Sequence, residues 1–374
     1  MSSNTRRRLI RGGAALLGLT AAGTAAGGWA LSRPEIGTQP TGERLARIKA
    51  SPNWADGMFR NLDPLETSKS GKSRTEIMLS FLTESNPGRF PAGPMPHASS
   101  RLADLPDDHF AWLGHSGFFI RMGGRRLLID PAMHPAVPCP GFYKPFPGAD
   151  ALQTGDLPPA DVLLITHDHY DHLDSATAVA LRSRVARVVC PLGVGAHFDL
   201  WGWAPERITE LDWFESTRDG SLTITALPAQ HFSGRTFQGN QTLWAGFMLE
   251  AGSFRLYHSG DTSFGRHFAM IREAFPTIDL ALLEDGQYDE DWPGVHLLPP
   301  SWRRAAQTLA PRAVMPIHNS KFCISHHPWK DPLEAGPAPQ RAVPEEINRS
   351  GGNAAEGTAS AGRASVVCLT TPDD

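Results

Sequence analysis

The feature that most constrains this chain is the stretch 163–174, LLITHDHYDHLD, in which an apolar run ends in a dense group of histidines and aspartates. The run DVLLIT is rich in leucine and β-branched residues, which predicts a buried strand. The polar group therefore begins where the strand ends, and the loops at strand ends often carry chemistry. Three imidazoles and three carboxylates within eight residues gain little from packing, so their presence needs another explanation.

The spacing within this group suits metal binding. His167 and His169 are two residues apart, so extended backbone places both imidazoles on the same side. Asp171 and His172 follow as the chain turns toward a helix, and together the four groups suit zinc, with manganese or iron as alternatives. Four ligands in so short a span could serve two ions. The alternative, a solvated loop that is histidine-rich by chance, is less favoured because HxHxDH follows a strand.

Three later residues occupy similar positions in the sequence. His231 ends SLTITALPAQH, Asp261 ends FRLYHSGD, and His318 ends AVMPIH. Taken singly, each is more often an ordinary surface or core residue than a ligand. Their shared position at the ends of apolar strands, together with the HxHxDH stretch, predicts that they complete a site for two metals.

The rest of the body alternates between short apolar runs and helical patterns. Strands are expected in HFAWLGHSGFFIRM, RRLLIDP, DVLLITH, RVARVVC, SLTITALPAQH, TLWAGFMLEAG, SFRLYHSGDT, IDLALLE and AVMPIHN. Helices are expected over 175–184 after a capping Asp174 or Ser175, over 263–275, and over 300–309. This order predicts an α/β arrangement in which helices cover sheets.

The N-terminus has the layout of an export signal. TRRRLIRGG is basic and precedes a weakly apolar run from Gly12 to Leu31, and its paired arginines resemble the twin-arginine signal. We expect residues 1–33 to be a signal or anchor. The protein would then be periplasmic or tethered to the inner membrane, since a 20-residue run could span a bilayer. Ala22, Thr24 and Ala26 are weak cleavage candidates.

Charge and cysteine content exclude some functions. The formal net charge is -4, and five arginines precede the first acidic residue, so the body of the protein is more acidic still. Such a body does not favour nucleic acid as a partner. The four cysteines form no CxxC pair, and we expect ordinary buried thiols or at most one disulfide; they are Cys139, Cys190, Cys323 and Cys368.

HxHxDH, a later histidine, an SGDT-type aspartate and a final PIH together resemble the metallo-β-lactamase superfamily of hydrolases, from about Trp112 to Pro332. The resemblance implies an α/β fold, an αββα sandwich with two metals along one edge and a metal-bridging hydroxide as the nucleophile. It assigns the first metal to His167, His169 and His231, the second to Asp171, His172 and His318, and the bridge to Asp261. Residues 34–105 would be an extended lead-in around a 106–333 hydrolase domain, and 334–374 an irregular tail with a possible final strand in ASVVCLTT.

Finer similarity points to one branch of that superfamily. THDHYDHLD, WLGHSGFFIRMGGRRLLIDP, LPAQHFSGR, HSGDTSF and SPNWADGMFRN look like the phospholipase D that hydrolyses N-acyl-phosphatidylethanolamine. The resemblance implies a phosphodiesterase that acts on such lipids, with possible association with a membrane surface. The alternative is a lactonase or another hydrolase of small esters or amides. Nothing in the sequence indicates an oligomeric state.

Further residues receive roles from position and resemblance. A catalytic role falls to Asp171 and to His296, which could contact the phosphate or protonate the leaving oxygen. Asp130 is expected to orient a ligand and His115 to pack on the substrate side, with simple turn hydrogen bonding as an equal alternative for both. Lys321 could place a positive charge near the site or reach solvent.

Two groups of residues are expected to be structural. His326 and His327 in HHPW are interpreted as loop structure, and not as ligands. Trp201 and Trp203 could belong to a membrane-facing loop, HFDLWGWAP, but packing in the core is the more favoured use.

Overall fold

The structure is a computed structural model that describes residues 33–66, 68, 70–83, 86–96, 101–136, 143–235, 238–335 and 366–368. The expected export signal therefore lies outside the described residues except for its last residue. The same is true of most of the C-terminal tail and of Cys139.

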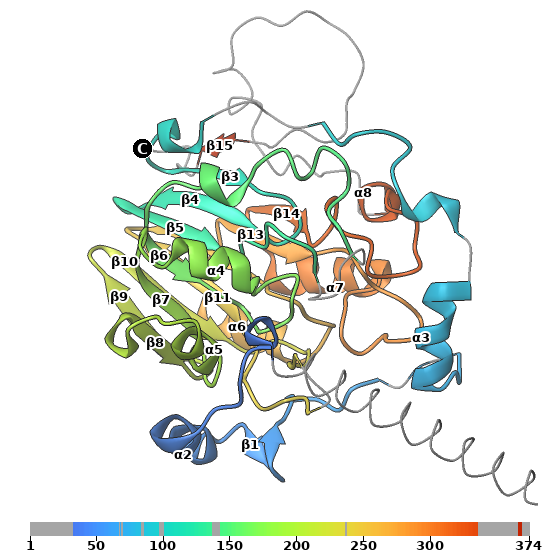
Figure 1. Ribbon diagram of the computed structural model, residues 1–374, viewed down its shortest axis with the longest axis horizontal. Helices are drawn as coiled ribbons and strands as arrows, with labels where there is room; N and C mark the ends of the chain where they lie inside the picture. Colours follow the sequence, from blue (N-terminus) through green and yellow to red (C-terminus); the bar gives the residue numbers. More distant parts are fainter. Residues whose placement is uncertain are drawn as a thin grey trace, which may run out of the picture.

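Two sheets form the centre of the molecule (Figure 1). The larger sheet has seven strands in the order β15 (Val366–Cys368), β3 (His109–Trp112), β4 (Phe118–Met122), β5 (Arg125–Ile129), β6 (Ala160–Leu164), β7 (Val185–Pro191) and β8 (Ile208–Leu211). The smaller sheet has six strands in the order β14 (Ala313–Ile317), β13 (Leu280–Glu284), β12 (Phe254–His258), β11 (Gly246–Ala251), β10 (Leu222–Leu227) and β9 (Ser216–Asp219). Strand β15 lies within the stretch where a last strand was expected.

The two sheets pack face to face around the main core. Ile129 and Leu164 from the larger sheet and Ile224 and Leu282 from the smaller sheet belong to one buried cluster, and none of the four is exposed. Alternate residues of these strands point inward, as period-two patterning requires. The sequence of each strand therefore supplies one apolar face to the space between the sheets.

Helices cover the outer faces of both sheets. Helices α4 (Ser175–Leu181) and α5 (Gly195–Leu200) pack on the larger sheet through a cluster that includes Leu163, Leu181 and Phe198. Helices α6 (His267–Ala274) and α7 (Pro299–Leu309) pack on the smaller sheet, where Tyr257 and Trp302 are buried. The layers are helix, sheet, sheet and helix, so the expected αββα sandwich is confirmed.

The helix boundaries differ slightly from those expected. Asp174 is the N-cap of α4, and its side chain accepts a hydrogen bond from Ala176 N at 3.0 Å. Helix α6 begins at His267, four residues later than the pattern suggested. Helix α7 begins with prolines in its first turn, where the missing N–H has no helical partner to lose.

The lead-in is not extended throughout. It contains α2 (Gly42–Ala50), the hairpin strands β1 (Trp54–Ala55) and β2 (Met58–Phe59), and α3 (Arg74–Thr83). Helix α2 has an acidic residue in its first turn and basic residues in its last, which its dipole favours. Because Ile48 and Phe59 are fully buried in the core between the sheets, tertiary packing holds this segment in place.

The remaining elements are short. They are α8 (Asp331–Ala335) and the 3-10 turns Pro34–Ile36, Pro87–Arg89, Leu102–Asp104, Thr154–Asp156 and Pro205–Arg207. Among the described residues, no helix has the length and apolar character needed to cross a membrane.

Strand direction brings the polar strand ends together. Strands β5 and β6 are parallel, and so are β12, β13 and β14, while β10 runs in the same direction as β12 because β11 is antiparallel to both. The carboxyl ends of these strands therefore meet along one edge of the sandwich. Each expected site residue follows one of these ends or lies in the adjoining loops.

Candidate metal centre

The first group of side chains forms where the chain leaves β6. His167, His169, His231 and Asp261 each offer one atom, and the four atoms lie within 4.8 Å of one another. His169 Nδ1 is 2.9 Å from His167 Nε2 and 3.2 Å from His231 Nε2. A set of three imidazoles and one carboxylate at this density is a typical ligand shell for a divalent transition metal.

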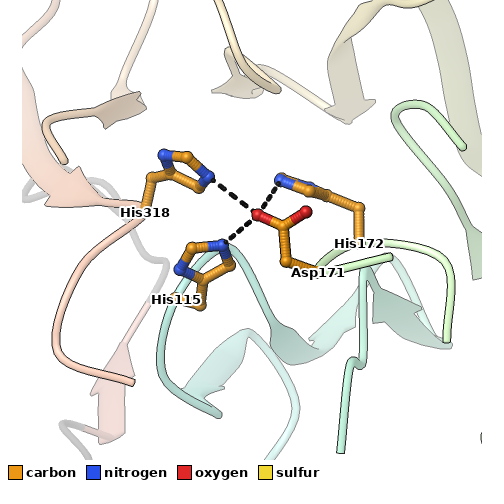
Figure 2. A group of neighbouring side chains, drawn as sticks. All are labelled: His115, Asp171, His172 and His318. Carbon is orange, nitrogen blue, oxygen red and sulfur yellow. Dashed lines mark hydrogen bonds and ion pairs between the residues drawn. The ribbon is translucent and has the colours of Figure 1, made fainter. Parts of the chain in front are cut away.

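The second group lies beside the first. His115, Asp171, His172 and His318 also offer four atoms within 4.8 Å of one another. Figure 2 shows the three imidazoles directed at one carboxylate: Asp171 Oδ2 lies 2.8 Å from His115 Nε2, 3.4 Å from His318 Nε2 and 3.5 Å from His172 Nε2. The group combines residues from the HxHxDH loop with residues about 50 and 150 positions away.

Asp261 lies between the two groups. Its Oδ2 is 3.8 Å from His167 Nε2 and 3.1 Å from His318 Nε2, while its Oδ1 is 3.2 Å from His172 Nε2. One carboxylate thus faces histidines of both groups. That is the position expected of a bridging ligand.

The backbone conformation around His115 and His318 is unusual. Their φ angles are 56° and 66°. Residues other than glycine seldom adopt this left-handed region, because it costs them about 1–3 kcal/mol each. Reciprocal hydrogen bonds hold the two loops together, because His318 N donates to His115 O and His115 N donates to Asn319 O, both at 3.0 Å. The two imidazoles are therefore placed by mutual contact between loops that are distant in the sequence.

Glycines make this packing feasible. At Gly260, just before Asp261, φ is 60° and an added Cβ would come within 2.6 Å of Ala245 O. At Gly286, an added Cβ would come within 2.1 Å of His318 O. Neither backbone position could approach its neighbour so closely with a side chain.

Hydrogen bonds behind the imidazoles orient them. His172 Nδ1 donates to Asp130 Oδ2 at 2.8 Å, and His231 Nδ1 donates to Val295 O at 2.8 Å. Because a proton on Nδ1 satisfies each acceptor, the neutral form of each imidazole would present the lone pair of Nε2 to a metal. His318 Nδ1 has the same kind of surroundings, with Gly286 O at 3.3 Å and Glu284 Oε2 at 3.4 Å.

The site is buried and strongly charged. Burial lowers the pKa of His167 and of His231 well below the usual value, and lowers the pKa of His115 to about 3. Burial also opposes charge on His172, but the carboxylates of Asp261 and Asp171 raise its pKa to about 10. The same carboxylates that favour charge on His172 would favour a bound cation.

The residues present fit a pair of cations. His172 Nε2 and Asp261 Oδ1 are both buried and make no hydrogen bond, although they face each other at 3.2 Å. Two orphaned atoms of this kind are costly unless a ligand satisfies them. Imidazole nitrogens and carboxylate oxygens also form the donor set that zinc, manganese and iron accept.

Sequence-predicted residues converge at this site. All seven expected ligands contribute to the two groups, which are His167, His169, His231 and Asp261 on one side and Asp171, His172 and His318 on the other. Asp130 lies behind His172 and contacts it directly, in the orienting position expected for it. His296 lies close by: it forms a further group with Asp261 and His318, and its Nδ1 is 3.2 Å from Glu284 Oε2.

Two expectations need correction. His115 was expected to pack on the substrate side, yet only 1% of it is exposed and it belongs to the second group of possible ligands. Of the two alternatives for Lys321, reach to solvent is wrong, because only 2% of it is exposed and its Nζ donates to Leu113 O at 3.0 Å and lies 3.8 Å from Met133 Sδ. A positive charge near the site stays a prediction. Burial lowers the pKa of Lys321 to about 8.

The residues interpreted as structural lie in structural positions. His326 Nδ1 is 2.8 Å from Asp289 Oδ2, and His327 Nε2 accepts a hydrogen bond from Gln287 N at 2.9 Å. Trp201 and Trp203 are buried, which confirms their use in the core. Cys190 and Cys323 are free, buried thiols.

Sequence reasoning missed two residues at the site. Glu284, at the end of β13, is fully buried; its Oε1 accepts a hydrogen bond from Leu297 N at 2.6 Å and its Oε2 faces His296 and His318. The run LALLE ends in an acidic residue just as other strands end in ligands, so the strand-end pattern could have identified it. Phe232, which follows a ligand, is 40% exposed, and its ring centroid is 4.5 Å from that of His169.

Comparison with known proteins places the chain among hydrolases. The family model described as the beta-lactamase superfamily domain matches residues 125–319. An uncharacterised protein of Mycobacterium tuberculosis is 36% identical over 332 residues, which cover 84% of this chain and 88% of that relative. A metal-dependent hydrolase of Thermococcus onnurineus is 30% identical over 251 residues, covering 66% of this chain and 92% of the relative.

Similarity to lipid-cleaving enzymes and to solved structures is more partial. The N-acyl-phosphatidylethanolamine-hydrolyzing phospholipase D 1 of Caenorhabditis elegans is 32% identical over 197 residues, 48% of this chain and 54% of that protein. The similarity thus spans about half of that relative. The crystal structure of an isothiocyanate hydrolase from Delia radicum gut bacteria aligns with a TM-score of 0.49 at 16% identity, over 61% of this chain and 91% of that one.

Proposed function

This chain belongs to the beta-lactamase superfamily of metal-dependent hydrolases, and we propose that within this superfamily it is a dinuclear phosphodiesterase of the phospholipase D type. The observation that carries the proposal is the pair of four-residue groups that share Asp261. Partial similarity to N-acyl-phosphatidylethanolamine-hydrolyzing enzymes supports the phosphodiester as the bond cleaved.

His167, His169 and His231 would hold one cation, and Asp171, His172 and His318 the other, with Asp261 between them. His115 would also belong to the second group, because its Nε2 lies 2.8 Å from Asp171 Oδ2. When bound, the two cations supply Lewis-acid stabilisation of the non-bridging phosphate oxygens and strengthen water as a nucleophile at neutral pH. Zinc is the metal we propose, since nitrogen donors outnumber oxygen donors in both groups.

His296 would act on the leaving group. Hydrolysis forms one bond from water oxygen to phosphorus, breaks the bond from phosphorus to the alcohol oxygen, and requires a proton on that oxygen. The His296 ring stacks on His318 at 5.1 Å between ring centroids, while Glu284 Oε2 holds its Nδ1 at 3.2 Å. This leaves His296 Nε2 as the atom that would deliver the proton.

One exposed aromatic ring beside the site supports a lipid substrate. Most side chains of the two groups are buried, but His169 and Asp171 are partly exposed and Phe232 is 40% exposed beside them. The open side of the site therefore carries an aromatic ring that lies edge-on to a ligand imidazole. Such a ring can bind the apolar part of a substrate while the phosphate lies over the ligands.

The proposals on location and partners rest on the sequence alone. We propose that the N-terminal signal directs the protein to the periplasm or to the periplasmic side of the inner membrane, and that membrane phospholipid is its substrate. Cell fractionation of a tagged full-length chain, with and without Arg6→Lys and Arg7→Lys together, tests this. Unchanged export in the variant would contradict a twin-arginine route.

The first experiment measures metal content per chain and release of phosphatidic acid from N-acyl-phosphatidylethanolamine, with Asp261→Asn beside the native chain. We expect close to two metals and lipid turnover in the native chain, and loss of both in the variant. Two metals without phospholipid turnover would contradict the phosphodiesterase and leave the superfamily's hydrolase chemistry, for which lactones are the next substrates to assay. Absence of metal binding would contradict the dinuclear site itself.

The second experiment tests the aromatic ring at the opening. Phe232→Ala should lower kcat/KM for long-chain substrates by roughly tenfold, the effect of losing about 1.4 kcal/mol of apolar contact, and should change turnover of a short-chain phosphodiester much less. Phe214→Ala is the matched control, because Phe214 is similarly exposed, at 43%, and belongs to neither group of the site. Equal losses for long-chain and short-chain substrates would contradict a lipid-binding role.

A further inference from the structure

Asp168 lies in the middle of the HxHxDH loop but points away from the metal groups. It is 2% exposed and sits between two proposed ligands, so extended backbone turns its side chain to the opposite face. Its Oδ1 accepts from Gly234 N at 2.7 Å, and its Oδ2 accepts from Thr242 Oγ1 at 2.9 Å and lies 3.2 Å from His197 Nε2. The back of the loop is therefore fastened to neighbouring elements by a fully buried carboxylate.

Arg235 extends this attachment to a distant segment. It is 7% exposed; its Nη1 donates to Asp168 O at 2.8 Å and to Leu173 O at 2.7 Å. Its Nε and Nη2 donate to Ile36 O at 3.0 Å and to Glu35 O at 2.7 Å. One guanidinium thus joins both ends of the HxHxDH loop to the chain 200 residues earlier.

Two more contacts hold the same early segment. Thr38 N donates to His197 Nδ1 at 3.1 Å, and Trp201 Nε1 donates to Pro34 O at 2.7 Å. Gly37 has a φ of 86°, and a Cβ there would come within 2.2 Å of His197 Nδ1. Residues 34–38, hereafter the clip, therefore fit against the back of the loop only because position 37 has no side chain.

Hydrogen bonds hold the clip against the back of the loop. A cavity of about 150 Å³ adjoins it, lined by Gly37, Asp168, His197, Arg235 and Thr242 among others. The residues that line this cavity are mostly polar or glycine. Loss of the hydrogen bonds should therefore release the clip while the sheets stay packed.

We propose that Asp168, Arg235 and His197 are positioning residues that fasten the HxHxDH loop to the clip, so that the segment directly after the export signal controls how tightly the metals are held. The inference rests on the proposed dinuclear site. Groups that orient ligands from behind typically contribute 10–100-fold to metal affinity, and these three orient the loop that supplies four of the proposed ligands.

The test is zinc affinity of the full chain, measured by competition with a chromophoric chelator, beside thermal unfolding of the metal-free chain. Gly37→Ala should raise the zinc dissociation constant by about 10–100-fold, with little change in the unfolding temperature of the metal-free chain. Gly42→Ala is the matched control: its φ is 57° and its Cβ would meet nothing within 4 Å, so it introduces similar backbone strain without touching the clip.

A second variant removes the hydrogen bonds between Arg235 and the clip by changing the arginine. Arg235→Lys keeps the charge but cannot reach four carbonyl oxygens at once, and it should weaken zinc binding as Gly37→Ala does. If Arg235→Lys does not fold, Gly37→Ala alone decides. Native zinc affinity in Gly37→Ala would overturn the positioning role, whereas absence of zinc binding by the native chain would overturn the proposed metal site and this inference together.

Discussion

Asp130 shows how a single residue behind the ligands can control the site. Its Oδ2 accepts hydrogen bonds from His172 Nδ1 at 2.8 Å and from Thr166 Oγ1 at 2.6 Å, and its Oδ1 accepts from Thr166 N at 2.9 Å. It therefore contacts both Nδ1 of a proposed ligand and the start of the HxHxDH loop. Its φ of 40° adds strain, which these contacts help to offset.

We predict that Asp130→Asn weakens metal binding by about 10–100-fold without abolishing it. The amide keeps one oxygen as an acceptor, but its NH₂ group would face a hydrogen-bond donor where the carboxylate had accepted a hydrogen bond. The measurement is zinc affinity by chelator competition. Asp161→Asn serves as the control, since Asp161 lies near the opposite end of β6 and accepts from Arg126 N at 2.8 Å. Equal affinities in the two variants would show that the contact with His172 does not orient it.

Lys321 is a second residue at this scale, and its burial affects the stability of the protein. Only 2% of it is exposed, and burial lowers its pKa to about 8 from an ordinary value of 10.5. Between these two pKa values the unfolded chain binds the proton and the folded chain does not, so stability rises with pH there. Below pH 8 both states carry the proton, and the folded state bears the full cost of a buried ammonium.

We therefore predict that Lys321→Met stabilises the protein at pH 7 by up to about 3 kcal/mol, less about 1 kcal/mol for the lost hydrogen bond to Leu113 O. The gain should diminish as pH rises from 8 toward 10.5. Urea unfolding of metal-free protein at several pH values measures it, with Lys330→Met, an exposed lysine, as the control. A variant less stable than the native chain at pH 7 would contradict this account.

At the scale of elements, helix α4 shows how the metal loop is closed. Its N-cap, Asp174, accepts not only from Ala176 N but also from Thr177 Oγ1, and from Met133 N and His134 N of the loop after β5. One carboxylate therefore joins the end of the HxHxDH loop, the helix that follows and a neighbouring loop. Ordinary helix caps satisfy only the helix.

We predict that Asp174→Ala lowers the free energy of unfolding by more than the ~1 kcal/mol typical of an N-cap, on the order of 2–4 kcal/mol, because buried donors in two elements lose their acceptor. Denaturant unfolding of the metal-free chain measures it. Thr41→Ala, at the N-cap of α2, is the control, since its side chain makes no capping hydrogen bond. If Asp174→Ala lowers the free energy of unfolding no more than this control does, Asp174 does not stabilise the neighbouring loop as well as the helix.

The elements that the sequence predicted share a strong local pattern. Runs such as DVLLIT and LALLE correspond to β6 and β13, and α4 and α7 lie within one to three residues of their expected limits. Elements without such a pattern were missed, including α2 and the six-residue α5. These short helices depend on contacts made elsewhere in the fold, as the burial of Ile48 and Phe198 shows.

At the scale of the whole molecule, the two sheets meet at an edge that concentrates charge. Asp171, Asp261 and Glu284 are brought together with seven imidazoles by strands from both sheets. Burial alone disfavours such charges, and a pair of cations would satisfy them. Metal binding should therefore hold the two sheets together at this edge.

We predict that removing the metals with a chelator lowers the unfolding temperature by several degrees, and that zinc restores it. Each bound ion contributes about 2.7 kcal/mol when its free concentration is 100 times its dissociation constant. Differential scanning calorimetry of the native chain and of Asp261→Asn measures the effect. The variant should show little response to zinc, and an equal response in both would contradict binding at this edge.

The sequence by itself determined the superfamily, the αββα sandwich and the seven side chains that converge on its edge. It could do so because these proposed ligands lie in the loops that follow apolar strands, and the strand pattern and the HxHxDH spacing are both local. Only the tertiary structure decided the roles of His115 and Glu284, the burial of Lys321, and the contact of Arg235 with residues 35 and 36. Those contacts join segments up to 200 residues apart in the sequence. Whether such segments meet in space depends on how the two sheets pack.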